Sequence, residues 1–520
     1  MLEPNKTFLN FNLPTIITNV KNMVNIDEFL KMREGNVYKY YINGEWKTSS
    51  SGKTIPIKNP YNEELVGKVQ ACTKPEVDNI IQCAQENRQC WIETAVAERV
   101  KILRKIGDLI MKWAEPIGSL LMRENGKPLN SAISEIERTA DIFYGTADYS
   151  SALTGETIMG DIYEEGSQKI SLNYRVPLGV VLCIGPFNYP FNLTGSKIAP
   201  ALLAGNTVVM KPPTQGSITA SHFGVILEEA GVPPGVFNIV TGRGSEIGDY
   251  LTSHSDINMI AFTGSSETGK NLAKQAGLKP LLLELGGKDA AIVLDDADLE
   301  LTVDAIISGA FSFNGQRCTA VKRVLPMPDI ANKLVKRITD EAQSLSVGNP
   351  AENKTIGPII NSKQCDYIQD LIDDALEKGA ELKCGNKREG NIMWPTVLDK
   401  VTTDMRVAWE EPFGPVLPII RISSAEEGIE ISNKSEYGLQ GMIFTNDIDL
   451  AFNIAQELEV GTVQINGKSS RGPDHFPFLG AKSSGLGTQG IKYSIEAMSR
   501  PKVVVMNLSE RGKRVKECKY

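Results

Sequence analysis

A cysteine and a glutamate stand where their side chains could carry out covalent chemistry on a carbonyl group. Cys318 ends the polar segment Asn314-Gly-Gln-Arg-Cys, and Glu284 lies 34 residues before it in the segment Glu-Leu-Gly-Gly. A thiolate adds to an aldehyde or acyl carbon, and a separate carboxylate can activate water to release the acyl group. An ordinary free cysteine is a small buried hydrophobe, but the flanking glycine and Arg317 predict an exposed thiol with a lowered pKa.

The composition limits the class of protein and the kind of substrate. The chain has 520 residues, enough for two or more domains, and its formal net charge of -8 disfavours nonspecific binding of nucleic acid. We therefore expect a soluble protein with a small-molecule substrate and no nucleic-acid partner.

Cysteine and histidine usage points to a reduced compartment and to no metal site. The eight cysteines are scattered without a CxxC pair, and only three histidines are present. The amino terminus has no basic segment followed by an apolar core, and the apolar run 178–184 is too short to span a bilayer. These features predict a cytoplasmic protein that does not bind membranes.

Short β-rich runs alternate with helical segments along most of the chain, after a region of helical apolar spacing at 74–147. The expected strands of a first series are 179–184, 207–210, 236–240 and 259–262. A second series has expected strands at 290–294, 322–327, 441–444 and 461–465, with helices at 299–311 and 450–458. Such alternation is typical of parallel α/β sheets. We expect two of them, with Cys318 at a helix-to-strand turn.

Three glycine-containing turns follow expected strands and are candidates for a nucleotide site. The turn Gly242-Arg-Gly244-Ser-Glu-Ile-Gly248 departs from the dinucleotide fingerprint and is weak evidence by itself. The turn at 262–271 nearly matches a phosphate loop, but Asn271 cannot supply the hydroxyl that ligates magnesium, which argues against an ATPase or kinase. Gly264 and Ser265 can still bind a pyrophosphate at a helix amino terminus. Lys211, in the third turn, suits a ribose or phosphate.

Six motifs in order give the chain a resemblance to the aldehyde dehydrogenase superfamily. They are Pro186-Phe-Asn-Tyr-Pro190, Lys211-Pro212, Phe262-Thr-Gly-Ser265, Glu284-Leu-Gly-Gly287, Gly315-Gln-Arg-Cys318 and Glu410-Glu-Pro-Phe-Gly-Pro415. Within the superfamily the chain is most similar to the NADP-dependent, non-phosphorylating glyceraldehyde-3-phosphate dehydrogenases, on Arg471-Gly-Pro-Asp-His-Phe-Pro-Phe478 and the segments around Arg138, Lys211 and Cys318. The resemblance covers about residues 37–507.

The resemblance implies a mechanism that agrees with the chemistry of the residues. Cys318 attacks the aldehyde, and the Asn188 side chain with the Cys318 backbone N–H holds the oxyanion. Hydride then passes to the nicotinamide, and Glu284 activates the water that hydrolyses the thioacyl enzyme. The expected reaction is the irreversible oxidation of D-glyceraldehyde 3-phosphate to 3-phosphoglycerate, with reduction of NADP and without inorganic phosphate. By itself, Asn188 fits a turn asparagine before Tyr189-Pro190 better than a functional residue.

The resemblance also assigns residues to the cofactor. Lys211 is expected at the adenosine ribose, Gly264 and Ser265 at the pyrophosphate beside Phe262, and Glu411 and Phe413 at the nicotinamide ribose. Many NAD-using relatives carry a glutamate where this chain has Thr214, and a carboxylate there would repel the 2′-phosphate of NADP. We therefore expect NADP as the cofactor, with NAD as a weaker alternative.

Arginines are expected to select the substrate. In the resembled family Arg138, Tyr189, Arg317 and Arg471 surround the substrate phosphate, and guanidinium groups pair well with phosphate. Arginines also hold carboxylates. An NAD(P)-dependent semialdehyde dehydrogenase, or another small aldehyde dehydrogenase, therefore remains the alternative function.

The expected fold is α/β: a Rossmann-type cofactor domain with a parallel sheet, an α/β catalytic domain and a small β arm. The NADP-binding domain is expected at 37–152 and 175–285, and the catalytic domain at 286–485. An oligomerisation arm is expected at 153–174 and 486–507, between an amino-terminal extension at 1–36 and a carboxy-terminal tail at 508–520. The arm predicts a homotetramer built from two dimers.

Overall fold

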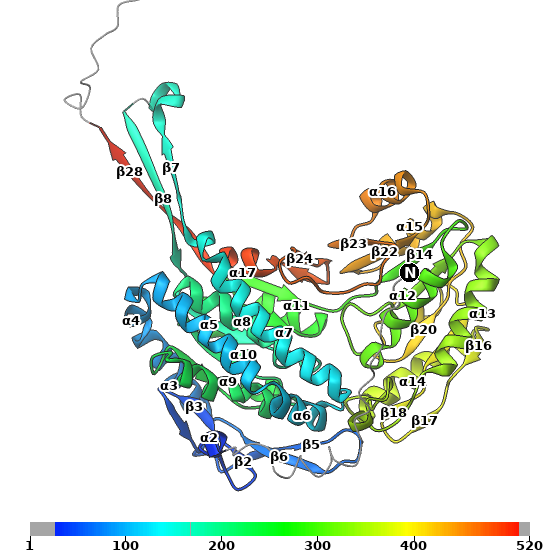
Figure 1. Cartoon of the computed structure of the whole chain (residues 1–520), viewed down its shortest axis with the longest axis horizontal. Helices are drawn as coiled ribbons and strands as arrows, with labels where there is room; N and C mark the ends of the chain where they lie inside the picture. The colour runs from blue at the N-terminus through cyan, green and yellow to red at the C-terminus, as the bar shows by residue number, and fades with distance from the viewer. Residues whose placement is uncertain (1–26, 167, 509–520) are drawn as a thin grey trace, which may run out of the picture.

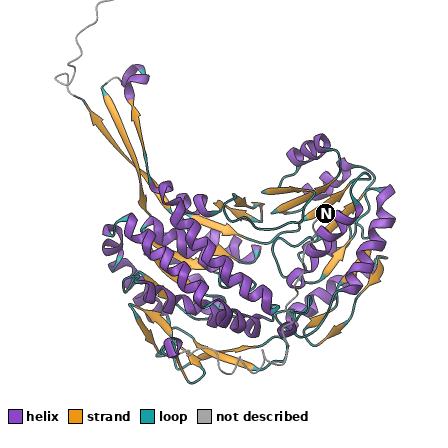
Figure 2. Cartoon of the chain, in the orientation of Figure 1, coloured by secondary structure: helices purple, strands orange, loops and turns teal. Residues whose placement is uncertain are grey.

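The computed structural model describes residues 27–166 and 168–508. Two α/β lobes lie side by side, and a narrow β arm projects from the body (Figure 1). Figure 2 shows helices covering the sheets of both lobes. The expected α/β class, with two lobes and an arm, is confirmed.

The first lobe is built on an eight-stranded sheet whose centre is parallel. Its parallel strands are β9 (Val180–Ile184), β10 (Thr207–Lys211), β11 (Phe237–Ile239), β12 (Met259–Thr263) and β13 (Leu281–Glu284). They lie side by side in the order β13-β12-β9-β10-β11. Numbered along the chain and read from β11, this is 3-2-1-4-5, the order of a dinucleotide-binding fold. The strand order reverses between β9 and β12, where such folds bind ligands.

The sheet is apolar on both faces because helices cover both. In β9, Val181 and Cys183 belong to the core under one helical layer, whereas Val180 and Leu182 belong to the core under the other. This division follows from the period of two along a strand. The first layer contains α5 (Val96–Lys112), α7 (Leu129–Asp148), α8 (Asn192–Ala204) and α9 (Ser217–Ala230), and the second contains α3 (Lys74–Glu86), α10 (Gly244–Ser253) and α11 (Ser266–Gln275).

Three antiparallel strands complete the edges of this sheet. β3 (Tyr40–Ile42) and β4 (Glu45–Lys47) extend it beyond β11, and β26 (Gly485–Leu486) pairs with β13 at the other edge. Gly485 is the register partner of Glu284. A segment that follows the second lobe in the sequence therefore lies directly beside Glu284.

Smaller elements pack around the first lobe. A second sheet has the order β1-β2-β6-β5, formed by Arg33–Glu34, Val37–Tyr38, Leu65–Gln70 and Thr54–Lys58. The remaining helices of this lobe are α2 (Asp27–Leu30), α4 (Arg88–Glu93), α6 (Ala114–Asn125) and α17 (Ile491–Ala497).

The second lobe contains a four-stranded parallel sheet and carries Cys318. The sheet has the order β15-β14-β22-β23, formed by Arg323–Pro326, Ala290–Val293, Gln440–Phe444 and Thr462–Ile465. Its helices are α12 (Leu299–Phe311), α13 (Pro328–Ser344), α14 (Ser362–Glu377), α15 (Ala425–Asn433) and α16 (Ile448–Glu457). Cys318 lies between α12 and β15, which confirms the expected helix-to-strand turn.

The remaining strands outside the arm are short. They are β16 (Glu381–Cys384), β17 (Arg388–Glu389), β18 (Ile392–Met393), β19 (Thr396–Asp399), β20 (Val416–Pro418), β21 (Tyr437–Gly438), β24 (Phe478–Leu479), β25 (Ala481–Lys482) and β27 (Thr488–Gln489).

The arm is a three-stranded antiparallel ribbon. β8 (Lys169–Pro177) lies between β7 (Glu156–Met159) and β28 (Ser499–Asn507), and its pairing with β28 runs from Ser499 opposite Pro177 to Asn507 opposite Lys169. Figure 1 shows the ribbon standing away from the lobes. Apolar side chains along it are exposed, including Val503, Val505 and Met506.

The packing differs from the expected boundaries at two places. Phe29 and Met32, inside the expected extension 1–36, are buried in the core of the first lobe. Ile491 and Ile495 of α17, inside the expected arm segment 486–507, are buried in the same core. Within the described residues only 499–507 of that segment form arm strand. The remainder of the extension, the tail from 509 and Cys518 lie outside the described residues.

None of the helices in the described residues combines the length and the apolar character that crossing a membrane requires.

Candidate active site

A cavity of about 980 Å³ opens at the point where the strand order of the first sheet reverses. Residues that directly follow β9, such as Gly185 and Asn188, line one side, and the turn after β12, including Gly264 and Ser265, lines another. Cys318 also lines this cavity. The cavity therefore joins a nucleotide-type crevice to a thiol from the other lobe.

The segment before Cys318 is held in an unusual backbone conformation. Phe313, Asn314 and Gly315 all have positive φ, at 49°, 56° and 68°. A Cβ at Gly315 would lie 2.4 Å from the Gly414 carbonyl oxygen, so only glycine fits this turn. The buried Asn314 side chain donates to the Pro358 carbonyl and accepts from the Gly357 N–H, which ties the segment to a second loop.

Cys318 and Glu284 meet across the boundary between the lobes. The Cys318 Sγ lies 3.9 Å from Oε1 of Glu284, and the glutamate is 3% exposed. Glu284 is the last residue of β13 and therefore lies at the carboxyl end of the parallel strands. The sequence prediction that these two groups act together thus has a matching geometry.

The predicted lowering of the thiol pKa is wrong for this structure. Burial and the nearby Glu284 carboxylate raise the pKa of Cys318 to about 12, although the Lys322 ammonium acts in the opposite direction. The Arg317 guanidinium cannot help because it donates to the Gly309 carbonyl at the end of α12. Arg317 and Cys318 are adjacent in sequence, but their side chains point in different directions. The guanidinium charge therefore does not lower the pKa of the thiol.

The Asn188 side chain is bonded to the loop that carries Cys318. Its side chain is buried, and Nδ2 donates to the Gln316 carbonyl at 2.9 Å. An amide nitrogen carries two N–H groups, so the second stays available to a substrate oxygen. The Asn188 carbonyl accepts from Lys127 Nζ at 2.7 Å, which fixes the backbone at this point.

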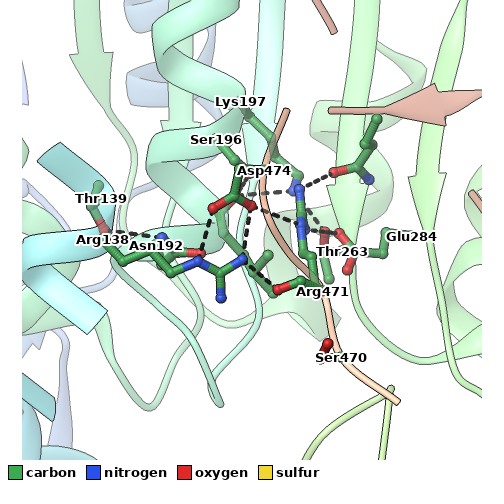
Figure 3. Close-up of polar contacts among 12 residues, drawn as sticks. Arg138, Thr139, Asn192, Ser196, Lys197, Thr263, Glu284, Ser470, Arg471 and Asp474 are labelled. Carbon is green, nitrogen blue, oxygen red and sulfur yellow. Dashed lines mark hydrogen bonds and ion pairs between the residues drawn. The ribbon is translucent and has the colours of Figure 1, made fainter. Parts of the chain in front are cut away.

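Glu284 belongs to a chain of polar contacts with three other residues. Arg471 Nη1 donates to Oε2 at 2.6 Å, and Thr263 Oγ1 donates to the same oxygen at 3.1 Å. Lys197 Nζ in turn donates to Thr263 Oγ1 at 2.6 Å. Figure 3 shows this chain of contacts. It holds the carboxylate in place next to the thiol.

Lys197 and Thr263 were not predicted from the sequence. Lys197 is completely buried in α8, where burial lowers its pKa to about 8 while the Glu284 charge opposes that shift. A single charged residue within an otherwise uncharged helix is the signal that could have found it. Thr263 stood inside the quoted Phe262-Thr-Gly-Ser265 motif.

Most of the expected cofactor residues line the cavity. Those that do are Thr214, Phe262, Gly264, Ser265, Glu411 and Phe413. Lys211 is the last residue of β10 and is 6% exposed, with its Nζ donating to the Pro212 carbonyl. Burial lowers the pKa of Lys211 to about 8. An anion near this ammonium would restore its charge, which fits a phosphate-bearing ligand.

The turn after β12 also fits a nucleotide phosphate. Ser265 is the N-cap of α11, and its side chain accepts from the Thr268 N–H. A Cβ at Gly264 would lie 2.4 Å from the Phe262 ring, so this approach requires glycine. In contrast, Gly242, Gly244 and Gly248 are not among the residues that line this cavity, and Gly244 starts α10.

Glu411 is held by a lysine that the sequence analysis did not single out. Lys322 Nζ lies 2.8 Å from Oε1 of Glu411, and it also donates to the Cys318 carbonyl. The Gly287 N–H donates to the same Glu411 oxygen at 3.2 Å. Lys322 thereby connects the cysteine loop to the expected nicotinamide end of the cavity.

The residues expected at the substrate phosphate do not line the cofactor cavity in the described part of the chain. Arg471 contacts Glu284, and both Arg471 and Arg138 contact Asp474, on the side of Glu284 away from the cavity. The Tyr189 ring lies against Lys127 Nζ, 3.6 Å from its centroid. The structure therefore groups Arg138 with Arg471, and places Arg317 apart, bound to α12.

The chain belongs to the aldehyde dehydrogenase family, whose sequence model matches residues 46–504. Among curated relatives it is 52% identical over 474 residues to the NADP-dependent glyceraldehyde-3-phosphate dehydrogenase of Streptococcus equinus, covering 91% of this chain and 99% of that one. It is 47% identical to the enzyme of the same name from Arabidopsis thaliana, over 92% of this chain and 97% of that one.

Solved structures give the same result. An NADP-dependent glyceraldehyde-3-phosphate dehydrogenase of Bacillus halodurans, complexed with NADP, superimposes with a TM-score of 0.90 at 53% identity. The match covers 92% of this chain and all of that chain. The aldehyde dehydrogenase fold predicted from the sequence is confirmed.

Proposed function

We propose that this protein oxidises D-glyceraldehyde 3-phosphate irreversibly to 3-phosphoglycerate, reduces NADP to NADPH, and uses no inorganic phosphate. The observation that carries the proposal is the placement of Glu284 Oε1 3.9 Å from Cys318 Sγ, in a chain about half identical to enzymes named for this activity. A base next to the thiol favours water as the acceptor of the acyl group.

The residues support two chemical stages. In the first, the Cys318 thiolate adds to the aldehyde carbon, and the oxyanion accepts hydrogen bonds from Asn188 Nδ2 and the Cys318 N–H. Collapse of this adduct, with loss of its carbon-bound hydrogen as hydride to the bound cofactor, would leave a thioester on Cys318. In the second, Glu284 takes a proton from water, the resulting hydroxide adds to the thioester carbon, and the thiolate leaves. Arg471 and Thr263 keep the Glu284 carboxylate directed at this position.

NADP fits the cavity at Thr214, three residues after Lys211. When bound, it supplies the nicotinamide ring that accepts the hydride. Lys211 is buried and carries a lowered pKa, and Thr214 adds no negative charge to the cavity wall. Both features favour a 2′-phosphate at this place, with NAD as the weaker alternative.

The substrate phosphate is assigned to Arg138, Arg471, Tyr189 and Arg317. Support is strongest for Arg471 and Arg138, because Arg471 contacts Glu284, which contacts the thiol, and Arg138 donates to the Arg471 carbonyl. Arg317 needs a side-chain rotation away from the Gly309 carbonyl to take part.

One assay tests the reaction. NADPH formation from glyceraldehyde 3-phosphate is followed with and without inorganic phosphate, with NAD in place of NADP, and with succinic semialdehyde as a second substrate. We expect equal rates with and without phosphate, and a higher kcat/KM with NADP and with the triose phosphate. A requirement for phosphate would overturn the mechanism, and a preference for succinic semialdehyde would overturn the substrate.

We also propose a homotetramer built from two dimers, located in the cytoplasm. The arm formed by β7, β8 and β28 exposes apolar side chains and two unpaired strand edges, which favours pairing with other subunits. The cysteines of the described residues are unpaired, in keeping with a reducing compartment.

A further inference from the structure

Asp474 lies between the two arginines that stand behind Glu284. It belongs to the segment Arg471-Gly-Pro-Asp474 that connects β23 to β24, and its side chain is 13% exposed. Figure 3 shows its carboxylate facing Arg138 from α7 on one side and Arg471 on the other. One carboxylate thus contacts a guanidinium group from helix α7 and another from the segment between β23 and β24.

Asp474 binds Arg138 as a fork. Arg138 Nε donates to Oδ2 at 2.8 Å, and Nη2 donates to Oδ1 at 2.8 Å. The second N–H of Nη2 serves the Arg471 carbonyl, also at 2.8 Å. Such paired bonds fix the plane of the guanidinium as well as its position. Three of the five N–H groups of Arg138 are therefore used to orient it.

The remaining nitrogen of Arg138 is available to a ligand. Among the described residues none accepts from Nη1, and Figure 3 draws no contact to it. Its two N–H groups point away from Asp474, because the fork occupies the opposite edge of the planar group. The side chain of Arg138 is 34% exposed, so this edge is accessible.

Arg471 depends on Asp474 much less. Its Nη1 binds Glu284 at 2.6 Å and its Nη2 binds the Gln489 side chain at 2.9 Å, whereas Nε lies 3.6 Å from Asp474. Losing Asp474 would leave these two shorter contacts in place. The effect of Asp474 must therefore pass mainly through Arg138.

We propose that Asp474 is a positioning residue for substrate specificity: it holds Arg138 so that the free Nη1 edge receives the phosphate of the substrate. The inference rests on the proposed function, because it assumes a phosphorylated aldehyde. Asp474 does not itself touch the substrate, and it takes no part in the chemistry at Cys318.

The test compares steady-state kinetics of the wild type and Asp474→Asn with two aldehydes. An amide offers one oxygen and sets its NH₂ against an arginine N–H, so the fork is lost. We expect the KM for glyceraldehyde 3-phosphate to rise about tenfold or more, since hydrogen bonds to charged groups are strong. The KM for unphosphorylated glyceraldehyde, the KM for NADP and kcat should each change less than about threefold. Asp141→Asn, an exposed carboxylate on the same helix as Arg138, is the control.

A double-mutant cycle separates positioning from a general structural role. If Asp474 acts through Arg138, adding Asp474→Asn to Arg138→Leu should leave the KM for the triose phosphate within about twofold of the Arg138→Leu value. A further rise of fivefold or more would overturn the proposal. Asp474→Ser, which removes the carboxylate with a smaller side chain, carries the same expectation and serves if the asparagine variant does not fold.

The remaining outcomes are also decisive. An unchanged or lower KM in Asp474→Asn overturns the proposal, and a lower value shows that Asp474 competes with the phosphate for the arginines. Failure of the proposed function looks different, because the wild type itself would then show no preference for glyceraldehyde 3-phosphate over glyceraldehyde.

Discussion

The contact between Cys318 and Glu284 has opposite effects on the two stages of the reaction. A carboxylate 3.9 Å from the sulfur is close enough to deliver water to a thioester, yet its charge disfavours the thiolate. With burial, it raises the pKa of Cys318 to about 12. The thiol of the cofactor-free enzyme is therefore protonated at neutral pH, and activation must come from bound ligands or from a movement of Glu284.

This leads to a prediction about thiol reactivity. In the cofactor-free enzyme, alkylation of Cys318 by iodoacetamide should accelerate about tenfold per pH unit from pH 7 to 10 without a plateau, because only the thiolate reacts. Glu284→Gln removes the nearby negative charge, lowers the thiol pKa, and should give faster alkylation at every pH in this range.

Cys318→Ser measures the background of this experiment, which comes mainly from exposed thiols such as Cys90. A plateau below pH 9 in the wild type would contradict the prediction. So would slower alkylation of the Glu284→Gln variant.

Two helices that meet behind the cofactor cavity show how elements position the site. Glu124, in the last turn of α6, is completely buried and accepts from the N–H groups of Gly216, Ile218 and Thr219 at the start of α9. The Thr219 hydroxyl donates to it as well. Burial raises the pKa of Glu124, and these four hydrogen bonds oppose that shift. Helix amino termini often bind anions through their free N–H groups. At the start of α9, the Glu124 carboxylate accepts hydrogen bonds from these groups instead.

A prediction follows for Glu124→Gln. The amide cannot accept four donors, so the variant should lose about 1–3 kcal/mol of unfolding free energy. The segment 211–216, which ends at α9, should become less ordered, so the KM for NADP should rise while the KM for the aldehyde stays constant. Urea denaturation and steady-state kinetics measure the two effects.

Glu137→Gln, an exposed residue on α7, is the matched control for Glu124→Gln and should change neither quantity. If Glu124→Gln is as stable as the wild type, the carboxylate does not hold α9. A rise in the aldehyde KM instead of the NADP KM would place its influence elsewhere in the site.

The β arm exposes more apolar surface than is usual on a monomeric protein. Along β28, Val503 and Val505 are 57% and 51% exposed, and Tyr174 on β8 is 42% exposed. A projecting ribbon with apolar faces and free strand edges is costly to leave in water. Contact with other subunits would remove this cost, which is why the arm supports the proposed tetramer.

The assembly can be tested with Val505→Asp. A charge on the exposed ribbon should oppose its burial between subunits, so the molar mass from light scattering should fall below that of a tetramer. Ile448→Asp, on α16 in the second lobe, has a similar exposure of 56% and should leave the mass unchanged. A wild-type monomer, or an unchanged mass in Val505→Asp, would contradict the proposed role of the arm.

The sequence by itself determined the α/β class, the order of the strands along the chain and the groups proposed for the chemistry. Local patterns are sufficient for this, since period-two apolar runs, glycine turns and the Cys318 and Glu284 motifs are each written in a few neighbouring residues. The helix-to-strand turn at Cys318 and the strands around it were predictable for the same reason.

Only the tertiary structure decided how these groups interact. Arg471 is 187 residues from Glu284, and Asp474 is 336 residues from Arg138, yet they form direct ion pairs. The raised pKa of Cys318 depends on packing between the lobes. The separation of Arg317 from the thiol and the Lys322–Glu411 contact depend on packing within the second lobe. Burial and charge act through space, so side-chain direction at a fold boundary cannot be obtained from spacing along the chain.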